Sequence, residues 1–270
     1  MGHCQGDVGD AKDAPETQHG EHGDGGFSRA PEDTGDAVGK GQQAVEQADG
    51  LHLFYTSPDG EENSPGTLEV EVCYHLDEED ALHISYLAKA DQDTVVNLTN
   101  HAYFNLNGEG SGSVLGHTLR LNASEYLPTS DSLIPVGESE PVAGTPMDFV
   151  NEKVIGAEIK ADFPALNYGK GYDNCWVIDG YEAGQIQEAA ELYAPESGRV
   201  LNVYTTQPGV QVYTGNWLAG SPVAKCGRSY NDYDGVAIEC QNFPDSPNKA
   251  DYPSPVLRPG EVYEQAIIFA

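Results

Sequence analysis

The sequence has few basic residues. Lysine and arginine together number 13 of 270, against 44 aspartate and glutamate residues, so the formal net charge is −31. A chain with this balance repels nucleic-acid phosphates and anionic lipid surfaces. We therefore expect no nucleic acid and no membrane among its partners.

The sequence also lacks a cysteine pattern and a long apolar run. Its five cysteines are Cys4, Cys73, Cys175, Cys226 and Cys240, an odd number with no CxxC pair, which predicts neither a disulfide framework nor a zinc site. No apolar stretch approaches the ~20 residues of a membrane span, and no signal-peptide core is recognisable. These features predict a cytoplasmic protein with reduced thiols and no bound metal.

Apolar side chains are scarce in the first 50 residues. This segment holds eleven glycines, eleven acidic residues and a single aromatic, Phe27. Such a composition does not offset the entropy lost on ordering. We expect residues 1–50 to be an acidic, glycine-rich and largely disordered or degenerate segment, followed by one domain over residues 51–270.

From residue 51 onwards, short segments alternate between apolar and polar residues. In "GTLEVEVCYHL", Leu68, Val70 and Val72 would share one strand face, while Glu69 and Glu71 would lie on the other. Alternation with period two is typical of half-buried strands. Similar patterns recur in "ALHISYLAKA", "TVVNLTNHAYFNL", "RVLNVYTTQ", "GVQVYTGN", "GVAIEC" and "EVYEQAIIF". The pattern predicts an all-β fold, a large antiparallel β-sandwich or a barrel, with short helical turns only near residues 147–152 and 247–250.

A histidine stands among polar and aromatic residues in "VNLTNHAYFNLNG", residues 96–108. If the segment is a strand, His101 shares a face with Asn97 and Thr99. An imidazole with a pKa near ~6.5 can donate a proton at neutral pH. The alternative is that His101 only bonds a strand carbonyl.

A carboxylate follows a glycine-rich turn in "NYGKGYDNCWVID", residues 167–179. Asp173 can accept hydrogen bonds from neighbouring hydroxyl groups. Tyr172 and Trp176 could stack on the apolar face of a sugar ring. The alternative is that Asp173 caps backbone amides of the turn.

A second carboxylate ends the apolar strand in "VAIECQNFPDSPN", residues 236–248. Glu239 would have a raised pKa if it is partly desolvated, which suits a general base near neutral pH. The segment "QVYTGNWL" adds Tyr213, Asn216 and Trp217 near another strand end.

Taken together, these motifs supply one acid, one base, one hydroxyl-binding carboxylate and several aromatics. That set suits proton transfer on a neutral sugar without a cofactor. We expect His101, Asp173 and Glu239 to converge on one open cleft, with Tyr213 or Trp217 nearby.

The motifs resemble those of the aldose 1-epimerase family. The resemblance rests on "NLTNHAYFNL", "GYDN", "QPGVQVYTGNWL" and "IECQNFPDSPN", and runs from about residue 51 to the C-terminus. It implies a mutarotase-like β-sandwich in which Glu239 takes the proton of the anomeric hydroxyl and His101 protonates the ring oxygen of glucose or galactose. Asp173, Tyr213 and Asn216 would contact the sugar, and so would His22, the nearest match to a further histidine of the family.

The chain departs from the family pattern near its start. It has no counterpart of the family's arginine motif, and the strands before it are not recognisable. Asn174 and Asn242 stand where the family has histidines. Both asparagines are tolerable, because neither position carries the proton chemistry. The missing arginine, however, predicts weak activity, and the altered start leaves two alternatives open, a non-catalytic sugar-binding relative and an inactive truncated product. A sugar-phosphate epimerase would need clustered Arg or Lys, which the motifs lack. We expect a monomer or homodimer.

Overall fold

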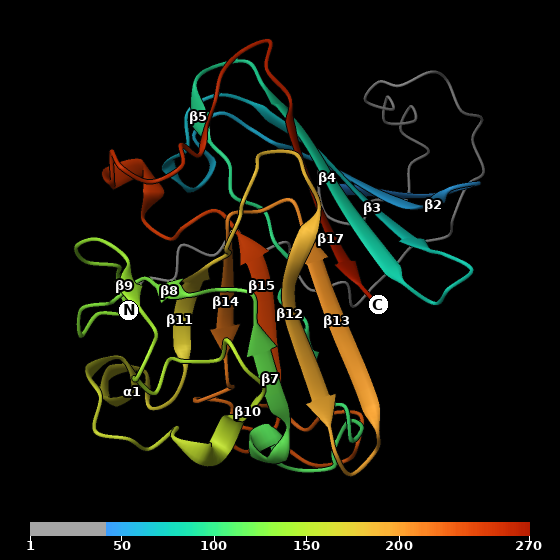
Figure 1. The fold of residues 1–270 in the computed structure, drawn as a ribbon. Coiled ribbons are helices and arrows are strands. Elements are labelled where there is room, and N and C mark those ends of the chain that lie inside the picture. Colours follow the sequence, from blue (N-terminus) through green and yellow to red (C-terminus); the bar gives the residue numbers. More distant parts are fainter. Residues whose placement is uncertain (1–41) are drawn as a thin grey trace. The chain divides into compact units, whose positions relative to one another are not determined.

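The described part of the protein is built almost entirely of antiparallel strands (Figure 1). The computed structural model describes residues 42–270. These residues divide into two compact units, one formed by residues 99–253 and the other by residues up to 98 together with 254–270. The predicted all-β, antiparallel fold is confirmed.

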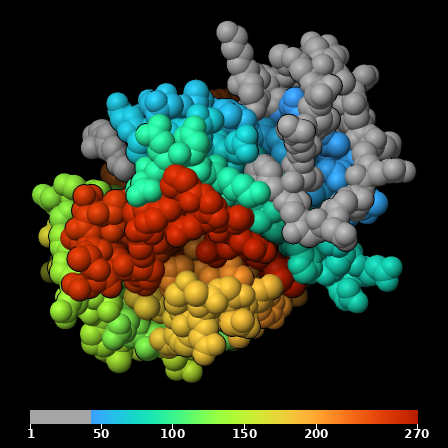
Figure 2. Space-filling model, turned by 90° about the horizontal axis from the view of Figure 1, so that it is seen from above, coloured from blue at the N-terminus to red at the C-terminus, as the bar shows by residue number. Residues whose placement is uncertain are grey.

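The unit of residues 42–98 and 254–270 contains one five-stranded antiparallel array. Its strands, in spatial order, are β1 (Gln42–Gln47), β2 (Gly50–Ser57), β3 (Leu68–Leu76), β4 (Leu82–Ala90) and β17 (Tyr263–Phe269). A short pair is formed by β5 (Thr94–Val95) and β16 (Val256–Leu257). Figure 2 accordingly shows the red C-terminal segment beside the blue-green segment that precedes residue 99.

The unit of residues 99–253 contains two sheets. One has six antiparallel strands in the order β6 (Tyr103–Phe104), β15 (Val236–Gln241), β14 (Gly209–Tyr213), β11 (Asp173–Val177), β8 (Glu125–Tyr126) and β9 (Glu140–Pro141). The other places β13 (Arg199–Thr205), β12 (Gln187–Ala194), β7 (Thr118–Leu121) and β10 (Lys153–Val154) side by side. Figure 1 shows β7, β12 and β13 in front of β11, β14 and β15, as in a sandwich.

Side chains between these two sheets form the core of this unit. Trp176 on β11, Val210 and Val212 on β14, and Ile238 on β15 have no exposed surface, and neither has Leu192 on β12. Strands buried on both faces read as continuous apolar runs, which explains the sequence "VAIEC". Burial of these side chains holds the six-stranded sheet rigid, and one face of that sheet carries the candidate site.

The single α-helix of the described residues is short. Helix α1 (Pro164–Gly169) begins with a proline, which suits the first helical turn, and ends where Lys170 takes a left-handed conformation with φ 62°. Short 3₁₀ turns occur at η1 (Glu61–Asn63), η2 (Val114–Gly116), η3 (Ile155–Ala157) and η4 (Ser246–Asn248). No helix within residues 42–270 has the length and apolar character needed to cross a bilayer.

Several local predictions need correction. Strand β1 and the first residue of β2 lie before residue 51, so the strand region begins earlier than predicted. The rest of the segment predicted to be disordered, residues 1–41, lies outside the described residues. Residues 96–102 form no strand, because only β5 and β6 at either end of that segment are paired. Residues 147–152 form no helical turn, whereas η4 lies close to the second predicted turn.

Strand β12 was not predicted at all. Its sequence "QEAAELYA" is rich in alanine and glutamate, which are depleted in strands. It forms because it lies between β7 and β13 and pairs with both of them. Tertiary pairing therefore overrides the local preference at this strand.

Candidate functional site

Strand register aligns a row of polar side chains across four neighbouring strands. Asp173 on β11 lies opposite Tyr213 on β14, Tyr213 lies opposite Ala237 on β15, and Ala237 lies opposite Tyr103 on β6. Residues that are direct cross-strand partners point to the same side of a sheet. One face therefore presents a carboxylate and two phenols.

The next row on the same face contains the second carboxylate. Glu239 on β15 lies opposite Gln211 on β14, two residues from Tyr213. The Gln211 side-chain amide nitrogen donates a 2.8 Å hydrogen bond to Oδ1 of Asp173. Gln211 thereby links the two rows and fixes the orientation of the Asp173 carboxylate.

Glu239 is held mostly out of solvent. It is only 8% exposed, and its chain neighbours Ile238 and Cys240 are fully buried on the other face of the strand. Burial, followed by the nearby charge of Asp173, raises the pKa of Glu239 from its usual 4.5 to about 8. A carboxyl group with such a pKa exchanges its proton near neutral pH, which is the property of a general base in a proton-transfer site.

His101 lies beside this carboxylate. It is in the loop between β5 and β6, and its Nε2 is 3.5 Å from Oε1 of Glu239. Its ring packs against Tyr103 at a centroid distance of 5.0 Å and meets Tyr213 edge-on at 6.4 Å. The Nδ1 atom of His101 is shielded from solvent and has no hydrogen-bond partner among the described residues.

Short hydrogen bonds fix the loop that carries His101. The Thr99 hydroxyl donates a 2.7 Å bond to the carbonyl of Cys240, the residue after Glu239. The amide of Ala102 donates to Oδ1 of Asn100. The loop that holds the imidazole is thus anchored to the strand that holds the carboxylate, which explains why two residues 138 positions apart meet.

His101, Asp173, Glu239 and Tyr213 therefore come together on one face of the six-stranded sheet. Gln211 and Tyr103 also lie on this face, and no sequence motif pointed to either of them. Alternation within "VQVY" places Gln211 on the same side as Tyr213 and would have revealed it. Tyr103 could not be found in this way, because the segment before it is a loop and does not alternate.

Asn216 does not reach this face, so its predicted contact with sugar is corrected. It is 0% exposed, and its side-chain nitrogen donates to the carbonyls of Gly169 and Tyr172 at 2.8 and 3.0 Å. Its Oδ1 accepts a 2.6 Å bond from the Thr214 hydroxyl. All three bonds hold the turn that leads into Asp173.

Tyr172 and Trp176 also lie elsewhere than predicted. Both are buried, and they donate hydrogen bonds to the carbonyls of Pro146 and Met147, each at 3.0 Å. Residues 172, 174 and 176 point to the side of β11 opposite Asp173, because side chains alternate along a strand. These two rings belong to the core, and neither is available for stacking on a sugar.

The remaining predictions concern His22, the cysteines and metal. His22 lies outside the described residues. Cys73, Cys175, Cys226 and Cys240 are free thiols. Within residues 42–270, no three His, Cys, Asp or Glu side chains are grouped in a way that could hold a metal ion.

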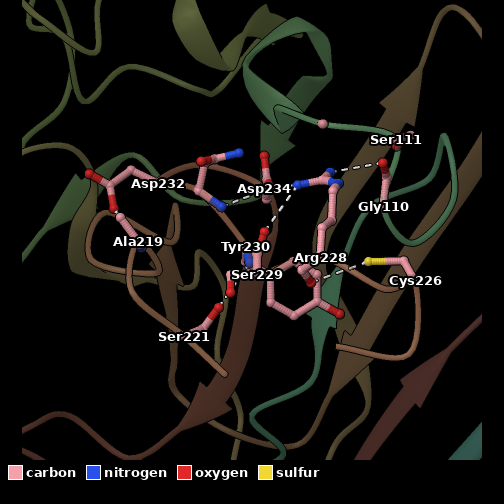
Figure 3. A network of polar contacts seen from close by, with 12 residues as sticks. Gly110, Ser111, Ala219, Ser221, Cys226, Arg228, Ser229, Tyr230, Asp232 and Asp234 are labelled. Atoms are coloured by element: carbon pink, nitrogen blue, oxygen red, sulfur yellow. Dashed lines mark hydrogen bonds and ion pairs between the residues drawn. The ribbon is translucent and has the colours of Figure 1, made fainter. Parts of the chain in front are cut away.

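A polar network organises the long connection between β14 and β15, residues 214–235. Arg228 donates to the Asp234 carboxylate at 2.9 Å and to the carbonyl of Gly110 at 2.8 Å (Figure 3). The Asp232 carboxylate accepts a 2.9 Å bond from the amide of Ala219. Because this connection joins the strands that carry Tyr213 and Glu239, the network supports both sides of the site.

Comparison with known proteins identifies relatives over most of the chain. The sequence model of the family described as aldose 1-epimerase matches residues 35–270. The chain is 42% identical over 222 residues to the galactose mutarotase of Homo sapiens, covering 82% of this chain and 63% of that protein. It is 40% identical over 224 residues to the aldose 1-epimerase of Escherichia coli K12, covering 82% and 64%.

Solved structures of similar fold carry names of the same kind as the proteins similar in sequence. An aldose epimerase homologue from C. elegans superposes with a TM-score of 0.74 at 26% identity, covering 85% of this chain and 67% of that one. A galactose 1-epimerase from Lactobacillus acidophilus gives a TM-score of 0.71 at 26% identity, covering 85% and 65%. The chain spans less than two thirds of the length of the curated relatives it matches.

Proposed function

The chain belongs to the aldose 1-epimerase family, and from this membership we propose that it interconverts the α and β anomers of a free neutral hexose, glucose or galactose. The proposal is carried by one observation, the placement of His101 Nε2 3.5 Å from Glu239 Oε1 beside the Asp173–Gln211 pair. A proton donor and a carboxyl group at this separation can exchange protons with two oxygen atoms that are bonded to the same carbon. The anomeric hydroxyl and the ring oxygen of a hexose are such a pair, since both are bonded to C1.

Ring opening requires two proton transfers. The ionised Glu239 carboxylate accepts the proton of the C1 hydroxyl, and the C1–O bond to the ring oxygen breaks. The protonated His101 imidazole donates its proton to that ring oxygen, and a free aldehyde results. Positioned acid and base groups of this kind each contribute roughly 10²–10⁴-fold to the rate.

Ring closure reverses these roles. Rotation about C1–C2 presents the other face of the aldehyde to the hydroxyl that attacks it. His101 takes back the proton of that hydroxyl, and Glu239 returns its proton to the aldehyde oxygen. Both groups regain their starting protonation states, so the cycle needs no cofactor.

Asp173, Gln211 and Tyr213 are proposed to hold the hydroxyl groups of the sugar. Asp173 accepts hydrogen bonds, Gln211 has a shielded Oε1 with no partner among the described residues, and Tyr213 offers a phenol. These groups and the acidic composition of the chain favour a neutral sugar over a sugar phosphate. We further propose that the protein is cytoplasmic and binds neither nucleic acid nor membranes. We also propose that it is a monomer or a homodimer, and light scattering on the purified protein measures this oligomeric state.

Polarimetry on freshly dissolved α-glucose or α-galactose tests the proposed reaction, after subtraction of the spontaneous rate. Glu239→Gln should abolish the protein-dependent rate, because an amide cannot accept the proton. His101→Asn should lower it by at least about 10²-fold, because a polar side chain remains that cannot shuttle a proton. Glu182→Gln and His75→Asn are matched controls at exposed positions and should behave like the parent. Equal rates for Glu239→Gln and the parent would exclude this site.

A further inference from the structure

The orientation of the His101 imidazole is not set by a hydrogen bond at its second nitrogen. Where a histidine moves protons, the nitrogen that faces away from the reacting group often donates to a carboxylate or a backbone carbonyl, and this bond fixes the ring. In His101, Nε2 faces Glu239, whereas Nδ1 is shielded from solvent and has no hydrogen-bond partner within residues 42–270. Among these residues, another kind of contact must therefore hold the ring.

Two tyrosine rings contact this imidazole. The centroid of the Tyr103 ring is 5.0 Å from that of His101 at an interplanar angle of 36°, and Tyr213 meets His101 nearly at right angles, at 6.4 Å and 85°. The two tyrosines also contact each other edge-on, with centroids 6.1 Å apart. These separations lie within the range of favourable aromatic pairs. Two rings in mutual contact thus restrict how the imidazole can turn.

Tyr103 is fixed to the strand that carries the second carboxylate. On β6 it is the cross-strand partner of Ala237, two residues before Glu239 on β15. Its ring lies against the bare backbone of Gly235, where an added Cβ would be 3.2 Å from Cβ and 3.5 Å from Cδ1 of Tyr103. A ring held in this way keeps its neighbour, the imidazole, at a set position relative to the Glu239 carboxylate.

Tyr213 is fixed from both ends of its side chain. Its hydroxyl accepts a 3.1 Å hydrogen bond from the backbone amide of Trp217. Its backbone on β14 pairs with Asp173 on one side and with Ala237 on the other. The second ring that meets His101 therefore has little freedom of its own.

The contact of Tyr103 with His101 is one of its ring and not of its hydroxyl. Burial, followed by the nearby ionisable groups of Tyr213, Glu239 and Asp173, raises the pKa of Tyr103. Its phenol therefore stays neutral and carries no proton to or from the site at neutral pH. What Tyr103 contributes is a flat surface against which the imidazole rests.

We propose that Tyr103 is a positioning residue, and that its ring, together with that of Tyr213, orients the His101 imidazole in place of a hydrogen bond at Nδ1. The inference rests on the proposed function, since it concerns how that same site directs its acid. Proton donation needs the donor within hydrogen-bond reach of the oxygen it protonates, and a small misplacement can cost up to about 10²-fold in rate. Loss of the Tyr103 ring should therefore lower kcat more than it weakens sugar binding.

Mutarotation kinetics with glucose separate a positioning role from a role in sugar binding. Tyr103→Leu should lower kcat by about tenfold and leave KM within about twofold of the parent's. Tyr103→Phe keeps the ring and should retain most of kcat. Tyr168→Leu is the matched control, because it replaces a tyrosine that is 42% exposed, against 46% for Tyr103, and it should match the parent in both constants.

Nuclear magnetic resonance of histidine C–H groups tests the contact itself and does not require turnover. In protein that contains isotope-labelled histidine, the His101 signals are assigned by their loss in His101→Asn. Ring currents of the two tyrosines should displace these signals in the parent. Tyr103→Leu should move them towards their positions in the unfolded protein, whereas Tyr103→Phe should leave them displaced. The signals of the other histidines should stay in place and thereby show that the variants are folded.

These measurements keep the two proposals apart. If the parent converts no sugar but Tyr103→Leu moves only the His101 signals, the proposed reaction fails and the orientation of His101 by Tyr103 stands. If glucose is converted and Tyr103→Leu matches the parent in kcat, or raises KM alone, the positioning role is overturned and the reaction stands.

Three further outcomes overturn the positioning role. An equal loss of kcat in Tyr103→Phe and Tyr103→Leu would make the hydroxyl the active part. A general collapse of the histidine signals in Tyr103→Leu would show that Tyr103 serves the fold as a whole. Absence of sugar conversion together with unmoved His101 signals would overturn both proposals.

Discussion

Glu239 combines two properties that oppose each other. As the proposed base it must be ionised, yet burial and the charge of Asp173 favour its protonated form and bring its pKa to about 8. Desolvation of a carboxylate also makes it a stronger base towards a bound hydroxyl group. The same residue is therefore expected to set the pH dependence of both the rate and the folding stability.

We predict a bell-shaped dependence of kcat/KM for mutarotation on pH, because the ring opens only when the Glu239 carboxylate is ionised and the His101 imidazole is protonated. This ratio reports groups of the free enzyme. Because the pKa of Glu239 is raised to about 8, the optimum should lie well above the pH range in which ordinary carboxyl groups ionise. Asp173→Asn should move the optimum to lower pH, since it removes a neighbouring negative charge, and should also lower the rate at every pH. A parent optimum below pH 6 would contradict the role of a desolvated Glu239. Rates need correction for catalysis by hydroxide and buffer.

We also predict that Glu239→Gln stabilises the folded protein at alkaline pH. Because the folded pKa is raised from 4.5 to about 8, the parent loses stability as pH rises from about 4.5 to about 8, the window in which the unfolded chain has released the proton and the folded one retains it. The variant lacks this loss. Its advantage in unfolding free energy should grow across that window to on the order of 5 kcal/mol and then level off. Urea unfolding at pH 5, 7 and 9 measures it, with Glu182→Gln as control.

At the scale of single elements, the turn between α1 and β11 determines where Asp173 points. Gly171 has φ 154°, and a Cβ there would lie 2.4 Å from Oδ1 of Asn216. Asn216 in turn bonds the carbonyls on either side of that glycine, those of Gly169 and Tyr172. The turn and its amide support thus act as one unit, and Asn216 is a positioning residue.

We predict that Asn216→Ala destabilises the protein by about 2 kcal/mol, because it leaves the buried carbonyl of Gly169 without its side-chain donor and removes one of the bonds to the Tyr172 carbonyl, which keeps those from Thr214. It should also raise KM for sugar, since Asp173 loses its fixed position. Asn151→Ala, at an exposed position, should leave both quantities unchanged. Urea unfolding and polarimetry on the same preparations measure the two effects. An unchanged unfolding free energy would show that the three side-chain bonds of Asn216 contribute little.

At the scale of the whole molecule, charge is the dominant feature. A formal charge of −31 on 270 residues creates self-repulsion that favours expanded states over the compact one. Added salt screens repulsion between exposed charges.

We predict that the thermal midpoint at pH 7.5 rises between 20 mM and 1 M KCl. If screening recovers about 1–2 kcal/mol, the rise should be roughly 2–8 °C. The effect should be much smaller near the isoelectric point of about 4.2, where the net charge is close to zero. Scanning calorimetry or circular dichroism at both pH values checks this. If the thermal midpoint rises equally at both pH values, the effect comes from salt acting on apolar surface and not from screening of charge.

The sequence alone determined the class of fold and supplied the residues proposed to carry the chemistry. Alternation in the segments that became β3, β4, β14 and β17 identified these strands, because one buried face imposes a period of two. It also singled out Glu239 as a candidate, since a carboxylate that ends an apolar strand is costly without a partner or a role, and His101 as a candidate through its polar and aromatic surroundings. It did not reveal β12, whose alanine-rich sequence becomes a strand only between two neighbours.

Only the tertiary structure decided which polar and aromatic side chains share a face. Register places Gln211 beside Glu239, sends Trp176 into the core, and turns Asn216 towards backbone carbonyls. The first two outcomes depend on pairing between segments far apart in the chain, and a register shift of one residue would reverse the faces of Gln211 and Trp176. Composition and spacing show which groups are available, whereas long-range pairing decides which of them meet.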